Sequence, residues 1–246
     1  LGEATKTIPY ITDAEKAYEF VIKLGAATNT DDAEGEIIAT SLSRPADAEI
    51  INELQSFIGE TMQVPPKFSA VKIDGERAYK LARAGEEVEI SARPLFVSEL
   101  TLIDRPTVNS VVLGMTCGKG GYVRAVARDL GQALGCYAHV TKLRRIWSGP
   151  FDLENSVTLE TLEPFARTLK IDKYLRPLED GLADLSKGTT NAEGAAKLQN
   201  GNPAICFTNA EYGDEIWVSY EGKAQAIGHF RSGEIFPNRV ILQKID

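Results

Sequence analysis

The sequence is poor in the residues that bind transition metals. It contains three cysteines, Cys117, Cys136 and Cys206, and two histidines, His139 and His229. The cysteines are too scattered for a zinc cluster, and two histidines cannot form a histidine-rich metal site and give little support to a histidine-based catalytic triad. We predict that the cysteines are buried, reduced thiols, which fits a cytoplasmic protein.

Long hydrophobic runs and standard catalytic motifs are also missing. No apolar stretch approaches the roughly 20 residues that a membrane-spanning helix needs, and no signal peptide heads the chain. There is no Gly-x-Ser-x-Gly elbow, no phosphate-loop signature and no His-Glu-x-x-His sequence. The acidic stretch 29–35 lacks the ligand spacing of an EF-hand, so we expect a solvated turn there. A length of 246 residues, with 43% hydrophobic and 25% charged residues, is typical of a soluble globular protein with one or two domains.

The net charge of −8 is unevenly distributed. Residues 1–60 contain twelve acidic and four basic residues, which leaves the rest of the chain neutral. Two stretches of that remainder are basic, and composition alone permits them to be either solvated surface or a nucleic-acid contact. Their basic residues are Lys67, Lys72, Arg77, Lys80 and Arg83 in the first stretch, and Lys119, Arg124, Arg128, Lys142, Arg144 and Arg145 in the second.

Hydrophobic periodicity predicts alternating strands and helices. Alternation with a period of two indicates strands at 18–24, 36–40, 95–102, 110–117 and 140–147, with a hairpin turn at 29–35. The helical period of 3.6 indicates helices at 50–58, 79–84, 122–134 and 158–169. After a linker at 177–187 we expect a short helix and strands at 216–220, 224–230 and 239–245. The pattern favours an α/β (α+β) fold with a mixed, largely antiparallel sheet, followed by a small β-rich domain.

Several strings, taken in order along the chain, resemble the TruB family of tRNA pseudouridine synthases. They are Gly-Glu-Ala-Thr-Lys at 2–6, Lys-Ala-Tyr-Glu-Phe at 16–20, Thr-Asn-Thr-Asp-Asp-Ala-Glu-Gly at 28–35, Gln-Val-Pro-Pro-Lys-Phe-Ser-Ala-Val-Lys-Ile-Asp-Gly-Glu-Arg-Ala-Tyr at 63–79, Cys-Gly-Lys-Gly-Gly-Tyr-Val-Arg at 117–124, and His-Val-Thr-Lys-Leu-Arg-Arg at 139–145. The resemblance covers roughly residues 1–155 continuously. The C-terminal part resembles the small PUA-like domain of the same family through weaker motifs.

This resemblance implies a fold and a reaction. The fold is the pseudouridine synthase fold, with helices flanking the sheet, in a catalytic domain at 1–181 that carries an RNA-gripping insert at about 62–93, and a PUA-like domain at 182–246. The reaction is the isomerisation of uridine 55 in the T-loop of tRNA to pseudouridine, after the base is flipped out of the loop. It needs no cofactor and no metal, and we expect a bacterial, cytoplasmic monomer.

The resemblance also assigns roles to individual residues. Tyr18 matches the active-site tyrosine that stacks on uracil and is a proposed proton acceptor, and Arg124 matches the arginine that pairs with the catalytic aspartate. Tyr122 and Leu143 match positions of the substrate pocket. The RNA contacts expected in this family fall on Lys67, Lys72, Arg77, Lys80, Lys119, Arg128, Lys142, Arg144 and Arg145.

One essential residue has no counterpart. The family's catalytic aspartate lies in a Gly-Gly-Thr-Leu-Asp-Pro-like segment just upstream of the string found here at 2–6, and the chain opens at Leu1 without an initiator methionine. We therefore expect a truncated chain that is inactive alone and in which Arg124 lacks its catalytic partner. We also expect the chain to aggregate unless the upstream segment accompanies it. The alternative is a non-catalytic tRNA-binding or folding-assistant protein, and the coding sequence upstream of Leu1 discriminates the two. A small-molecule α/β enzyme would need a phosphate loop or metal ligands that are missing.

Overall fold

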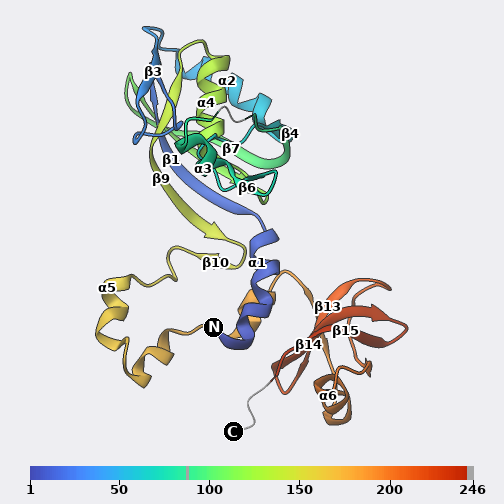
Figure 1. The fold of residues 1–246 in the computed structure, drawn as a ribbon. Helices are drawn as coiled ribbons and strands as arrows, with labels where there is room; N and C mark the ends of the chain where they lie inside the picture. Colours follow the sequence, from blue (N-terminus) through green and yellow to red (C-terminus); the bar gives the residue numbers. More distant parts are fainter. Residues whose placement is uncertain (87–88, 243–246) are drawn as a thin grey trace. The chain divides into compact units, whose positions relative to one another are not determined.

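The computed structural model describes residues 1–86 and 89–242, which form two compact units (Figure 1). One unit consists of residues 15–148, and the other combines residues 1–14 with residues 149–246. The domain boundary that the sequence suggests at 181/182 remains a prediction.

The unit at 15–148 is built on an antiparallel sheet. In this unit its strands follow the order β9-β1-β8-β7-β4, and each neighbouring pair is antiparallel. They are β1 (Lys16–Leu24), β4 (Gly59–Gln63), β7 (Arg93–Thr107), β8 (Ser110–Cys117) and β9 (Ala138–Ser148). The largely antiparallel sheet and four of these strands confirm the prediction. The edge strand β4 was missed, because Gly59 was interpreted only as the end of the preceding helix.

One face of this sheet carries the core. Alternate residues of β8 are buried, and Phe20 of β1 pairs across the sheet with Leu113 on one side and Leu143 on the other. Helix α4 (Val123–Ala133) covers that face, because Val126 and Leu130 belong to the same buried cluster as Phe20. Each fully buried side chain of this size contributes about 1.5–3 kcal/mol of hydrophobic stabilisation.

Helix α4 begins directly after a glycine-rich break and ends at a tight turn. Gly135 after the helix has a φ of 62°, a conformation that glycine adopts without strain. Gly131 lies so close to the chain at Ala138 that a Cβ atom would clash with the backbone. Helix α4 and strand β9 are therefore held together closely, and Arg124 and Arg128 of α4 are half-buried against the turn at 29–35.

The remaining elements of this unit form a hairpin and an insert. The hairpin pairs β2 (Ala26–Thr28) with β3 (Ile37–Thr40). The predicted turn and its second strand are confirmed, but the first strand, β2, was not predicted. The helix expected at 50–58 is α2 (Asp47–Leu54), followed by the 3-10 turn η2 (Gln55–Phe57). The insert contains β5 (Lys72–Ile73), β6 (Glu76–Arg77) and α3 (Ala78–Arg83), which matches the short helix expected near 79–84.

The second unit contains a curled sheet whose strands follow the order β11-β13-β14-β15-β12, with only the β11–β13 pair parallel. Its strands are β11 (Ser186–Thr189), β12 (Ala204–Ile205), β13 (Glu215–Tyr220), β14 (Lys223–Arg231) and β15 (Glu234–Val240). Its other elements are η1 (Gly2–Thr7), α1 (Ile8–Asp13), β10 (Phe151–Asp152), α5 (Leu159–Leu162), η3 (Glu163–Phe165), η4 (Leu169–Tyr174), η5 (Leu178–Leu182) and α6 (Ala192–Gln199). The small β-rich C-terminal part is thus confirmed.

Two predictions in this unit are wrong, and a third is confirmed only in part. The helix expected at 158–169 stops at Leu162, because Pro164 has no N–H to continue it and the chain turns into η3. The expected linker at 177–187 is structured instead: Leu182 of η5 is fully buried in a cluster with Trp217 and Ile227. The expected strand at 239–245 overlaps only the end of β15, and residues 243–246 lie outside the described residues.

In the part of the chain that the structure describes, every helix is too short or too polar to cross a membrane.

Candidate functional site

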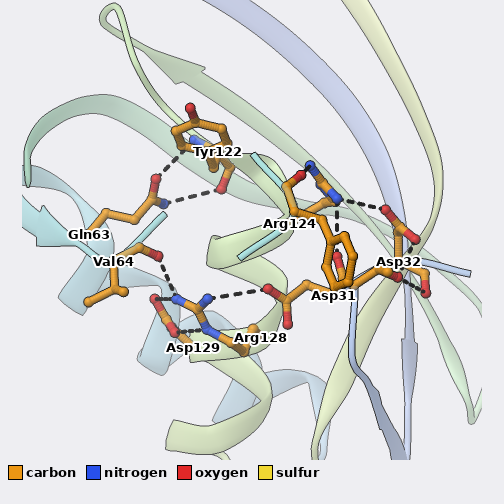
Figure 2. A network of polar contacts seen from close by, with 10 residues as sticks. Asp31, Asp32, Gln63, Val64, Tyr122, Arg124, Arg128 and Asp129 are labelled. Atoms are coloured by element: carbon orange, nitrogen blue, oxygen red, sulfur yellow. Dashed lines mark hydrogen bonds and ion pairs between the residues drawn. The ribbon is translucent and has the colours of Figure 1, made fainter. Parts of the chain in front are cut away.

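The first turn of α4 holds Arg124 in a fixed position. Its Nη1 donates to Asp32 Oδ2 at 2.9 Å and to the carbonyl of Thr30 at 3.1 Å, and its Nη2 donates to the carbonyl of Phe68 at 2.9 Å (Figure 2). The expectation that Arg124 lacks a carboxylate partner is therefore wrong. Because the 29–35 turn and the insert both provide acceptors, the guanidinium connects three segments that are far apart in the sequence.

The acidic turn is preorganised for this contact. Asp32 Oδ1 accepts from Thr30 Oγ1 at 2.6 Å and from the backbone N–H of Glu34 at 3.1 Å, which leaves Oδ2 facing Arg124. Asp31 adopts a φ of 63°, which aspartate tolerates better than most residues. The composition of the turn predicted that it is solvated. Instead, its two aspartates face arginines of α4 (Figure 2).

One turn further along α4, Arg128 is enclosed by acceptors. Its Nε lies 2.7 Å from Asp129 Oδ1, its Nη1 lies 3.2 Å from Asp31 Oδ2, and its Nη2 donates to the carbonyl of Val64 at 2.8 Å. Burial raises the pKa of Asp31, although Arg128 and Arg124 pull it down. The pKa of Arg128 is raised despite its burial, foremost by its bond to Asp129. The two aspartates thus differ in their distance from the Arg128 guanidinium. The shorter contact identifies Asp129 as the principal partner of Arg128.

A reciprocal pair of hydrogen bonds fixes the backbone of Tyr122, the residue that precedes α4. The side chain of Gln63 donates to the carbonyl of Tyr122 at 3.2 Å and accepts from its N–H at 2.9 Å. Gln63 is buried, so these bonds satisfy an amide that would otherwise be costly to enclose. Tyr122 packs against the buried cluster that contains Val71 and Ala78 of the insert. The insert is therefore attached to the beginning of α4.

Asp32, Tyr122 and Arg124 line a cleft of about 480 Å³. Its walls come from the acidic turn, the insert and the beginning of α4, and aromatic, cationic and anionic groups all line it. The lining side chains include Asp32, Glu34, Ser69, Tyr79, Arg83, Tyr122 and Arg124. The cleft lies within the volume range of small-molecule and nucleotide sites, about 300–1,000 Å³.

Tyr18 and Leu143 form a second grouping, on the sheet. They share one face, because Phe20 pairs with Leu143 and Tyr18 pairs with Arg145 without a register shift between them. The Arg145 guanidinium lies 5.6 Å from the centre of the Tyr18 ring, and Leu143 is 51% exposed. Tyr18 also packs against the cluster that contains Val123, the residue before Arg124. Neither Tyr18 nor Leu143 is among the residues that line the cleft.

Comparison with known proteins identifies the family. Residues 1–123 match the model of the TruB family pseudouridylate synthase N-terminal domain, and residues 124–183 match the tRNA pseudouridylate synthase B C-terminal domain. A tRNA pseudouridine synthase B from Ruegeria sp. (strain TM1040) is 64% identical over 99% of this chain and 81% of its own length. The protein of the same name from Agrobacterium fabrum is 41% identical over 98% of this chain and 79% of its own length. The chain belongs to the TruB family.

A solved structure shows the same fold. A chain in a crystal structure of a Cbf5-Nop10-Gar1 complex superposes with a TM-score of 0.73 over 99% of this chain and 71% of that chain, at 20% sequence identity. A TruB-family chain and this distant neighbour therefore share the predicted mixed α/β architecture.

The predicted RNA contacts are mostly exposed. Lys67, Lys72, Arg77 and Lys80 on the insert and Lys119, Lys142, Arg144 and Arg145 near α4 and β9 are all solvent-accessible. Arg128 differs, because its charge is offset by two carboxylates in a half-buried position. Its role as an RNA contact remains a prediction.

Other residues of the site were not predicted from the sequence. Asp31 and Asp32 had been assigned to a solvated turn, and Gln63, Ser69 and Tyr79 had been given no role. All five lie inside the strings that carry the family resemblance, at 28–35 and 63–79, which was the available signal.

The cysteines are buried and unpaired, as predicted. Burial raises the pKa of Cys117 and of Cys206 to about 11, so both are protonated thiols at neutral pH. In residues 1–86 and 89–242, no group of three or more histidine, cysteine, aspartate or glutamate side chains is arranged to hold a metal ion.

Proposed function

We propose that this TruB-family chain is the larger part of an enzyme that isomerises uridine 55 in the T-loop of tRNA to pseudouridine. The relatives that match nearly its whole length are named tRNA pseudouridine synthase B. The observation that carries the proposal is the anchored guanidinium of Arg124 at the start of α4, beside the core cluster on which Tyr18 packs. It supplies a rigid cation where the family places the partner of its catalytic carboxylate.

In this proposal the flipped uracil lies on the sheet face of Tyr18 and Leu143. The N1–C1′ bond breaks, the base turns, and a C5–C1′ bond forms while C5 loses a proton and N1 takes one up. Burial raises the pKa of Tyr18, so the phenol is neutral at physiological pH and is better suited to stacking than to acting as a strong base. Stacking of a base on an aromatic side chain contributes about 1–3 kcal/mol. The exposed Leu143 would shield the detached base from water.

The essential aspartate would come from sequence outside these 246 residues. A guanidinium has five N–H donors, and the contacts of Arg124 to Asp32, Thr30 and Phe68 leave donors for a second carboxylate. Such a pair would keep the aspartate ionised and fix its rotamer. Asp32 would then orient Arg124 and would not itself attack the sugar.

The test is release of tritium from tRNA labelled at uracil C5. We expect the 246-residue chain alone to release none above background, and the natural gene product that carries it to release tritium at a rate similar to that of the Ruegeria relative. The pseudouridine must map to position 55. Turnover by the isolated chain would disprove the proposal that the essential aspartate lies outside these 246 residues. Tight tRNA binding without turnover by the natural gene product would instead support a non-catalytic tRNA-binding or folding-assistant role.

A further inference from the structure

The segment at 63–68 is attached to the start of helix α4 at both of its ends. At one end, the side chain of Gln63 exchanges two hydrogen bonds with the backbone of Tyr122 (Figure 2). At the other end, the carbonyl of Phe68 accepts from Nη2 of Arg124 at 2.9 Å. Two consecutive prolines lie between these contacts, and both are buried. Because proline fixes its φ angle, the segment is stiff, and Arg124 is held at a fixed place relative to Gln63.

The contact with Gln63 also takes the place of a helix cap. Tyr122 is the N-cap residue of α4, and its own side chain makes no capping hydrogen bond. The Tyr122 carbonyl accepts from the N–H of Val126 at 3.1 Å and from the amide of Gln63 at 3.2 Å, while the Tyr122 N–H donates to Gln63 at 2.9 Å. Gln63 is 7% exposed, so water competes little for these bonds. The first turn of α4 therefore takes its position from the edge strand β4.

We propose that Gln63 is a positioning residue for the reaction, which places the Arg124 guanidinium through the backbone of Tyr122. The proposal rests on the proposed function, in which Arg124 pairs with the catalytic aspartate. Arg124 follows Tyr122 by two residues, so a shift of the helix start moves the guanidinium with it, and a displacement of about 1 Å can slow a reaction a hundredfold. Gln63 does not line the cleft of about 480 Å³, so it acts through α4 and not on the substrate directly.

The reciprocal contact requires a side chain that donates and accepts at once. A carboxamide does so at every pH, whereas a carboxyl group of the same shape does so only when it is protonated. Gln63→Glu therefore makes the contact depend on pH. The charged groups nearest to it are Asp129, which lines the same small cavity and bonds Arg128, and Arg93, which lies opposite Gln63 in β7. Arg93 is exposed, so burial and Asp129 keep the pKa of the introduced carboxyl at or above its ordinary value of about 4.3.

The test is single-turnover tritium release by the natural gene product, with enzyme in excess over tRNA and rates expressed per folded molecule. At pH 8, Gln63→Glu and Gln63→Met should each slow release about tenfold, less than a hundredfold because Asp32 and Thr30 still bond Arg124. The Kd for tRNA should stay within about threefold. From pH 8 to pH 5, the rate of Gln63→Glu relative to the unmodified enzyme at the same pH should rise at least about twofold, because at pH 5 at least about a sixth of the introduced carboxyl is protonated.

Two controls separate positioning from a general loss of structure or a change of charge. Gln63→Met is similar in length but cannot titrate, so its relative rate should stay low at every pH. Gln132→Glu adds the same charge at an exposed position of α4, and it should match the unmodified enzyme within about twofold throughout. A relative rate of Gln63→Glu that does not change with pH would overturn the proposal, as would full activity of Gln63→Met or a loss confined to the Kd for tRNA. Failure of the proposed function would appear separately, as missing tritium release by the unmodified gene product.

Discussion

The first and second turns of α4 use the same residue type against the same acidic turn, yet their surroundings differ. Arg124 meets one carboxylate and two carbonyls, lines the cleft and retains free donor capacity. Arg128 meets two carboxylates and one carbonyl and does not line the cleft. A guanidinium between two carboxylates is electrostatically satisfied, whereas one with a single carboxylate can still bind an anion. We propose that Arg124 acts in the reaction, whereas Arg128 stabilises the fold.

The largest expected effect is on catalysis at the first turn. Arg124→Lys keeps the positive charge but loses the planar fork that connects Asp32, Thr30 and Phe68. We expect the rate of pseudouridine formation by the natural gene product to fall at least about a hundredfold, because a misplaced carboxylate costs that much. Single-turnover tritium release measures it. A rate within a few-fold of the unmodified enzyme would show that the fork is not required.

The second turn should matter for stability. Arg128→Met removes the partner of Asp31, whose side chain is only 14% exposed, and that of Asp129. We expect the free energy of unfolding to drop by about 2–3 kcal/mol, somewhat less than for a fully buried pair. Urea denaturation at neutral pH measures the loss. An unchanged midpoint would show that the two carboxylates are adequately solvated without Arg128.

The two carboxylates around Arg128 should contribute unequally. Asp129→Asn removes the partner at 2.7 Å and should cost about 1 kcal/mol, whereas Asp31→Asn should cost less because burial already disfavours the charged form of Asp31. Denaturation of both variants under identical conditions ranks them. The reverse order would mean that the contact at 3.2 Å is the stronger one.

The smallest effect is a pH dependence. Burial raises the pKa of Asp31 above that of the unfolded chain, so its contribution to stability is fully present below the unfolded pKa and is lost as pH rises through the folded pKa. Asp31→Asn cannot ionise. Its stability relative to the unmodified protein should therefore increase as pH rises from acid toward neutral, and a flat difference across that range would contradict the assignment.

Much of the fold could be predicted from local pattern. The alternation in β1 and β8 and the 3.6-residue spacing in α4 each bury one face, so periodicity identified them. The pattern was misleading where one residue overrides it, as Pro164 does within an apparently helical stretch. Leu182 looked like linker because its partner Trp217 is distant in sequence.

The candidate site was predictable only in part, because many of its contacts join segments that are distant in sequence. Motifs identified Arg124 and Tyr122, which the structure brings to one cleft. Asp32, which contacts Arg124, and Asp31, the second carboxylate partner of Arg128, lie 92 and 97 residues away from these arginines, so no local pattern could pair them. An unpartnered hydroxyl such as that of Ser69 is a property of packing and has no signal in the sequence.

The most direct test compares Arg124→Gln with Arg128→Gln in the natural gene product, at a temperature where both variants remain folded. Single-turnover conversion of uridine 55 is measured per folded molecule for each. We predict a loss of at least about a hundredfold for Arg124→Gln and a change within about threefold for Arg128→Gln. Equal losses, or an active Arg124→Gln enzyme, would contradict it.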